Sequence, residues 1–110
     1  MLRAISPLEF QQMLSAEKKP LLFAFMRKDA GFRLQIEAVE EACRGLEDKL
    51  EVYLLDADQF PSFWERHGFR GTPAFAIYLH GRKQATLLGR ATAQMLGKLL
   101  LDYLEMEYFL

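Results

Sequence analysis

The chain has 110 residues, of which 51 % are hydrophobic, and its 14 basic and 15 acidic residues leave a formal net charge of −1. This length fits one domain over residues 1–110, and the near-neutral charge gives no electrostatic basis for binding nucleic acid or an acidic membrane surface. No apolar stretch reaches the roughly 20 residues that span a bilayer, and residues 1–7 lack the apolar segment of a secretion signal, so we expect a cytoplasmic protein.

The N-terminal segment predicts a short edge strand at residues 2–5 and then a helix at residues 7–15. Ser6 and Glu9 are spaced as a capping box, with Pro7 at the first helical position. The residues expected on the apolar side of this helix are Leu8, Met13 and Leu14.

Residues 21–26 are an uninterrupted apolar run of strand length, which predicts the central strand of a sheet. Polar residues at 27–31 end this strand. From residue 32 to about residue 48, hydrophobic side chains recur at helical spacing, so we expect an amphipathic helix. Its apolar stripe consists of Ile36, Val39, Cys43 and Leu46.

Residues 51–56 predict a strand and residues 61–67 a short helix, followed by a second apolar strand at residues 74–79. A polar turn at 80–83 and a strand at 84–88 complete a hairpin. The aromatic residues expected mostly in the core are Phe60, Phe63, Trp64 and Phe69. The last helix begins at about Thr92 and has its apolar stripe at Leu96, Leu99, Leu100, Tyr103 and Leu104.

The predicted order βαβαβαββα indicates an α/β fold with helices on both faces of a mixed sheet. The loop Gly68-Phe69-Arg70-Gly71-Thr72-Pro73, the apolar strand and hairpin after it, and Gly89 at the hairpin's end resemble the C-terminal half of the thioredoxin family. Upstream, Asp58-Gln59-Phe60-Pro61 is similar to that family's D-Q-x-P run. The resemblance covers about residues 20–104 and implies a three-layer α/β/α sandwich in which Pro73 is cis and faces the active-site helix.

In redox-active members of that family, the turn after the central strand carries W-C-G-P-C-K, and the first cysteine lies at a helix N-terminus that stabilises its thiolate. The resemblance places Asp29 at the first cysteine position and Phe32 at the second, and it aligns the family's buried aspartate with Phe23. With nucleophile, resolving group and proton acceptor absent, dithiol exchange at this turn is chemically excluded. We interpret Asp29 as the N-cap of the helix, whose carboxylate accepts from free N–H groups.

These observations favour a redox-inactive protein- or peptide-binding or chaperone-like module, with no catalytic residue, no cofactor and no metal. An extended peptide is expected along the Thr72-Pro73 edge by main-chain pairing. The residues assigned to the partner site are Asp29, Ala30, Gly31, Phe32, Thr72, Pro73 and Gly89. In what it lacks, the chain resembles the cysteine-free thioredoxin-like proteins that assist bacterial hydrogenase maturation. A purely structural role stays open for Asp29, for Pro73 and for Phe32.

Two other functions stay open. One is an oxidoreductase-type enzyme that works through Cys43 as a single thiol, which requires an exposed thiolate of lowered pKa, although the apolar stripe favours a core position. The other is a structural homodimer joined by residues 105–110, because a chain end seldom keeps several apolar residues unless they dock. His67 and His80 are expected at the solvated surface, since neither has a second ligand at metal-site spacing.

Overall fold

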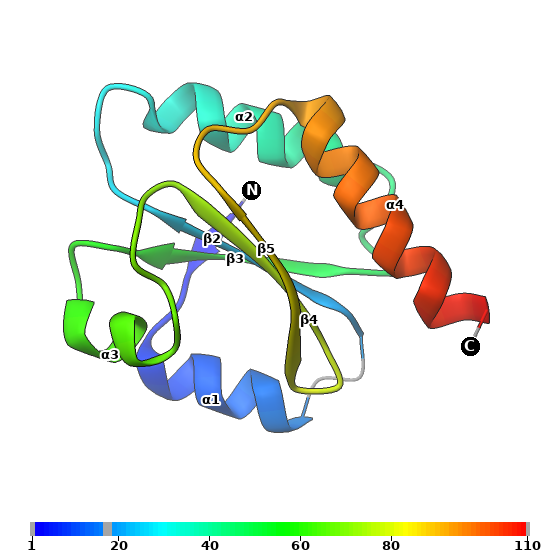
Figure 1. Ribbon diagram of the computed structural model, residues 1–110, viewed down its shortest axis with the longest axis horizontal. Helices are drawn as coiled ribbons and strands as arrows, with labels where there is room; N and C mark the ends of the chain where they lie inside the picture. The colour runs from blue at the N-terminus through cyan, green and yellow to red at the C-terminus, as the bar shows by residue number, and fades with distance from the viewer. Residues whose placement is uncertain (1, 17–18, 110) are drawn as a thin grey trace.

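A mixed five-stranded sheet runs through the centre of the protein, with helices on both faces (Figure 1). The computed structural model describes residues 2–16 and 19–109, with the backbone alone at 105–109. The strands are β1 (Arg3–Ala4), β2 (Leu21–Met26), β3 (Glu51–Asp56), β4 (Ala74–Leu79) and β5 (Arg82–Leu88). The helices are α1 (Pro7–Ala16), α2 (Phe32–Cys43), α3 (Pro61–Arg66) and α4 (Ala93–Phe109). The predicted element order and fold class are confirmed.

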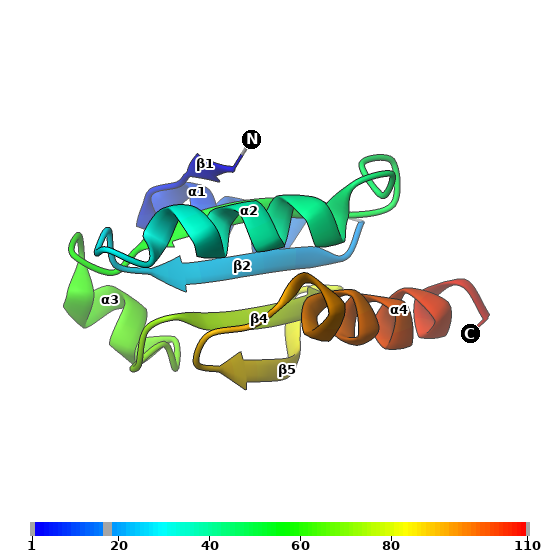
Figure 2. The same ribbon diagram turned by 90° about the horizontal axis from the view of Figure 1, so that it is seen from above.

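The strand order is β1-β3-β2-β4-β5, so β2 is central and β1 lies at an edge, as predicted. β2 pairs in parallel with β3 and antiparallel with β4, which forms the predicted hairpin with β5. Every residue of β2 and of β4 is buried, because helices cover both faces of these strands. α2 and α4 lie against each other on one face, and α1 and α3 cover the other (Figures 1 and 2).

Side chains of β2 alternate between two hydrophobic layers. Ala24 and Met26 pack in the layer under α2 and α4, whereas Phe23 and Phe25 pack in the layer with α1 and α3. Phe23 therefore lies on the sheet face opposite α2. The resemblance aligns the family's buried aspartate with this position, so in this chain an apolar ring occupies it, within the layer that α1 and α3 cover.

Phe10 of α1 is the centre of the layer with α1 and α3. Its side chain is completely buried, and its ring centroid lies 4.9 Å from that of Phe23 and 5.5 Å from that of Trp64. The predicted apolar side of α1 contained Leu8 instead, but Leu8 is 64 % exposed. Met13, three residues after Phe10, shares its face of the helix, whereas Leu8, two residues before it, points away.

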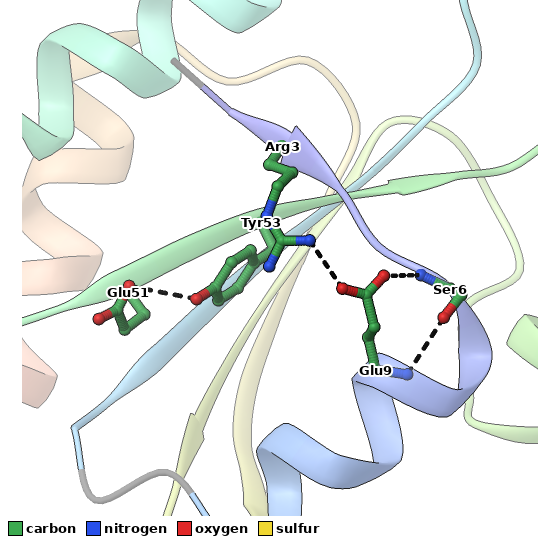
Figure 3. A network of polar contacts seen from close by, with 5 residues as sticks. All are labelled: Arg3, Ser6, Glu9, Glu51 and Tyr53. Carbon is green, nitrogen blue, oxygen red and sulfur yellow. Dashed lines mark hydrogen bonds and ion pairs between the residues drawn. The ribbon is translucent and has the colours of Figure 1, made fainter.

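Figure 3 shows how α1 begins and how it is tied to β1 and β3. The N–H of Ser6 donates to Glu9 Oε1 at 3.0 Å, and the N–H of Glu9 donates to Ser6 Oγ at 3.2 Å, which confirms the capping box. Arg3 Nη1 donates to Glu9 Oε2 at 2.7 Å, and its guanidinium lies 5.4 Å from the centre of the Tyr53 ring. The Tyr53 hydroxyl donates to Glu51 Oε2 at 3.2 Å. The hydrogen bonds from Arg3 and Ser6 lower the pKa of Glu9.

Two element boundaries differ from the prediction because of backbone conformation. α2 ends at Cys43, five residues early, since Arg44 is extended and Gly45 has φ 85°, in the left-handed region that glycine tolerates. The hairpin turn has two residues, not four: His80 and Gly81 have φ 52° and 79°, and β5 already begins at residue 82.

The aromatic and histidine predictions hold in part. Trp64 and Phe69 are buried, but Phe60 is 51 % exposed, since it lies outside α3 as the N-cap with φ 58°. His67 is half-buried rather than solvated, with its ring centroid 5.1 Å from that of Phe10. Burial and the nearby charges of Arg66 and Lys83 lower the pKa of His67. His80 is exposed, as predicted, and Phe63 is half-buried.

Candidate functional site

Three loops meet at one end of the sheet: residues 27–31 after β2, residues 68–73 before β4 and residues 89–92 after β5 (Figure 1). Strand pairing brings them together. Phe25 near the carboxyl end of β2 pairs with Ala74 at the start of β4, and Ala74 pairs with Leu88 at the end of β5. The predicted site residues, which are distributed over these loops and the first residue of α2, therefore lie at the same end of the sheet.

The Thr72-Pro73 peptide bond is cis, as the resemblance implies. Pro73 directly precedes β4, and its carbonyl accepts a hydrogen bond from the N–H of Gly89 at 2.8 Å. This bond extends the β4-β5 ladder by one step and places Gly89 beside the cis proline. Thr72 and Gly89 are exposed and Pro73 is half-buried, so these predicted site residues form a continuous accessible edge.

Arg90 connects this edge to the loop before α2. A β-carbon built on Gly31 would collide with the Arg90 guanidinium, so that group lies directly against the Gly31 backbone. Arg90 is exposed. Because Gly31 has no side chain, the Arg90 guanidinium can occupy this space. Arg90 directly follows Gly89, so it connects the predicted residues Gly31 and Gly89.

Gln35 holds the loop of residues 89–92 against α2. Its side chain is buried, its Nε2 donates to the Ala91 carbonyl at 2.8 Å, and its Oε1 accepts from the Ala91 N–H at 3.0 Å. The sequence analysis identified neither Gln35 nor Arg90 as a functional residue. One signal was present for Gln35, which falls four residues before Val39 and so on the buried stripe of the helix.

Asp29 is not the N-cap of α2. The N-cap is Gly31, which makes no side-chain cap, and the Asp29 carboxylate accepts from the Gly31 N–H at 3.0 Å while its carbonyl accepts from the Phe32 N–H at 3.2 Å. Asp29 lies two residues before the N-cap, so its carboxylate closes the turn that precedes the helix instead of capping the helix. Asp29 and Ala30 are exposed.

Phe32 contributes both to the core and to a groove. It is half-buried against the layer under α2, and it lines a groove of about 470 Å³ between α2 and the β1-β3 edge of the sheet. Ile36 and Leu54 give the groove an apolar floor, and Lys28 and Arg33 belong to its lining on the side of the three loops. Neither of the predicted roles, core packing or exposed contact, describes Phe32 alone.

Cys43 lies far from this site. It is the last residue of α2, eleven residues after Phe32, which corresponds to about 16 Å along the helix axis. The side chain is half-buried, and burial, with a smaller effect of the Glu47 charge, raises the pKa of its thiol to about 11. This shift is opposite to the one that a single-thiol enzyme requires.

The native Cys43 thiol is therefore expected to react slowly with a disulfide reagent. Raising its pKa from 9.0 to about 11 reduces the thiolate fraction at pH 8 about a hundredfold, and the thiolate is the reacting species. Stopped-flow absorbance with an aromatic disulfide reagent should show this slow reaction in buffer and a fast one in 6 M guanidinium. Equal rates in both conditions would contradict the burial of Cys43.

No group of three or more His, Cys, Asp or Glu side chains suited to a metal ion occurs within residues 2–16 and 19–104. In the part of the chain that the structure describes, none of the helices has the length and apolar character to cross a bilayer. The predicted dimer contact at residues 105–110 lies outside the described side chains and stays a prediction.

No family model matches the chain. A thioredoxin of Griffithsia pacifica is 27 % identical over 81 residues, which cover 73 % of this chain and 74 % of that protein. The solution structure of oxidised thioredoxin from Plasmodium falciparum superposes with a TM-score of 0.80 over 94 % of this chain and 98 % of that one, at 21 % identity. The chain has the thioredoxin fold.

A chloroplastic protein, thioredoxin Y1 of Arabidopsis thaliana, is 23 % identical over 99 residues, which cover 89 % of this chain but 58 % of that protein. On the thioredoxin fold of the present chain, the three loops lie at the carboxyl end of the central strand β2. The sequence holds one cysteine, Cys43, so none of these loops carries a thiol.

Proposed function

We propose that this thioredoxin-fold protein is redox-inactive and binds an extended segment of another protein at the edge formed by Thr72, Pro73 and Gly89. The observation that carries the proposal is that the backbone of Thr72 is exposed and not hydrogen-bonded within the described part of the chain. Thr72 lies just outside β4, and its backbone N–H and C=O make no hydrogen bond with any residue in the described ranges. Unpaired main-chain groups at a strand end can pair with an added strand.

The surroundings of Thr72 support a binding role because they are held in place. The Gly89–Pro73 hydrogen bond sets one side of the edge, and the two bonds between Gln35 and Ala91 fix the adjoining loop. A preformed site loses less conformational entropy when a partner binds. The groove that Phe32 lines, between α2 and the β1-β3 edge, adds an apolar surface that begins at the start of α2.

The position of the cysteine thiol in the chain favours a binding function over catalysis. Cys43 is the single cysteine, it is at the opposite end of α2, and its raised pKa disfavours the thiolate. We therefore expect no reduction of insulin by the purified protein. Reduction that persisted in a Cys43→Ser variant would contradict the proposal.

Substituting a bulky side chain at the proposed binding edge tests the proposal directly. Thr72→Trp and Ala30→Trp place a large side chain at exposed positions of the site, and Gln12→Trp does the same on α1, on the other face of the sheet. Proteins crosslinked to the wild type in cells and quantified by mass spectrometry should fall about tenfold or more with either site variant and stay unchanged with Gln12→Trp. A partner set that is empty, or equal for all four proteins, would refute a binding site at this edge.

A further inference from the structure

Positive charge collects around the proposed edge although the whole chain carries a net charge of −1. The exposed basic residues of the three loops and the start of α2 are Arg27, Lys28, Arg33, Arg70 and Arg90. The acidic residues nearest to them in the sequence and at the end of β3 are Asp29, Asp56 and Asp58. Glu37 follows one turn further along α2.

Three of these four carboxylates, all except Glu37, have partners in the protein. Asp29 accepts from the Gly31 N–H, Asp56 accepts from the Asp58 N–H at 2.9 Å, and Asp58 pairs with Arg27 at 3.1 Å. The remaining cations are Lys28, Arg33, Arg70 and Arg90, and none of these four makes an ion pair with a residue that the structure describes.

Two of these unpaired cations, Arg70 and Arg90, belong to the loops that contain Thr72 and Gly89. Arg70 is two residues before Thr72 in the same loop, and Arg90 directly follows Gly89, which is bonded to Pro73. Arg33 and Lys28 line the groove between α2 and the β1-β3 edge, which Glu37 and Glu40 line further along the helix. Each of these cations is exposed, so its charge faces an approaching partner.

We infer that the segment bound at this edge is an acidic extended peptide, which pairs its main chain with Thr72 and sets carboxylates against Arg90, Arg33 and Arg70. The inference rests on the proposed function and specifies the chemical class of the partner. Guanidinium groups match carboxylates through two parallel hydrogen bonds, and complementary charge selects partners and speeds association. Gly31 contributes by leaving Arg90 its place beside the loop.

A bead-bound library of random decapeptides tests the inference. Beads that bind the wild type in 0.15 M salt, and do not bind Thr72→Trp, are sequenced. We expect Asp and Glu to be enriched about threefold over the library in these peptides. The double variant Arg33→Gln/Arg90→Gln should lose the enrichment, and the control Arg44→Gln/Arg82→Gln, which removes two exposed arginines outside the site, should keep it.

Affinity measurements on one acidic peptide and its amide counterpart, with Asn and Gln in place of Asp and Glu, give the size of the effect. The acidic peptide should bind about tenfold more tightly in 0.05 M salt, with a smaller difference in 0.3 M salt, because salt screens exposed charges. Selected peptides without acidic enrichment would overturn the inference and leave peptide binding intact. If every bead that binds the wild type also binds Thr72→Trp, the inference and the proposed function both fail.

Discussion

Replacing Phe10 by alanine is expected to lower the free energy of unfolding by roughly 3–5 kcal/mol. The Phe10 side chain is completely buried, and its ring lies within aromatic contact distance of Phe23, Trp64 and Tyr78, with centroid separations of 4.9, 5.5 and 6.0 Å. Truncation removes the hydrophobic transfer energy of the ring and leaves a cavity that the surrounding rings fill only in part. Because a domain of this size has a total stability of about 5–15 kcal/mol, the variant should be close to unfolding.

Urea denaturation followed by far-ultraviolet circular dichroism measures this loss. The matched control is Leu8→Ala on the same helix, whose side chain is 64 % exposed and whose truncation should change stability by less than about 0.5 kcal/mol. Phe10→Leu keeps the site apolar and should cost less than the alanine variant, so it gives a reading if Phe10→Ala does not fold. Equal losses for Phe10→Ala and Leu8→Ala would show that Phe10 is not central to the core.

Replacing Gln35 by leucine is expected to cost about 2–5 kcal/mol, because it leaves two buried backbone groups without partners. The Ala91 carbonyl loses its bond from Gln35 Nε2, and the Ala91 N–H loses its bond to Gln35 Oε1. Ala91 is 7 % exposed, so water reaches these groups poorly unless the loop opens. The loop of residues 89–92 should therefore detach from α2, and Arg90 with it.

Hydrogen exchange separates loop opening from global unfolding. The Ala91 amide should exchange at least about tenfold faster in Gln35→Leu than expected from the loss of global stability, whereas the amide of Phe75 in β4 should follow global stability alone. Gln12→Leu, an exposed glutamine of α1, serves as the control and should leave both amides unchanged. If the exchange rate of the Ala91 amide did not change in Gln35→Leu, the two hydrogen bonds of Gln35 would not be what holds the loop.

The two buried strands could be predicted to the residue, and the apolar faces of α2 and α4 were also predicted correctly, whereas the face of α1 and the end of α2 were not. β2 and β4 are continuous apolar runs between polar or proline residues, and burial on both faces requires that pattern. In α1, the predicted apolar side included Leu8, although Phe10 is the residue with helical spacing to Met13 and Leu14. The end of α2 depended on the left-handed backbone of Gly45, which spacing alone does not reveal.

The candidate site was predicted in part. The loop ending at Pro73 carried a recognisable motif, and the structure places Gly31 and Gly89 at the same end of the sheet as that proline. The prediction that Asp29 is the N-cap of α2 was wrong. The N-cap is two residues later, at Gly31, and the Asp29 carboxylate closes the turn before it. Arg90 was missed because nothing in its local sequence indicates contact with Gly31.

By itself, the amino-acid sequence determined the sheet, the layering of helices about it and the absence of a cysteine pair, because these follow from local hydrophobic pattern and composition. Only the tertiary structure decided how the loops join. Gln35 and Ala91 are 56 residues apart in the chain, yet they share two hydrogen bonds. Such a contact depends on how α2 and the β4-β5 hairpin pack on the same sheet, and no local pattern encodes that distance in space.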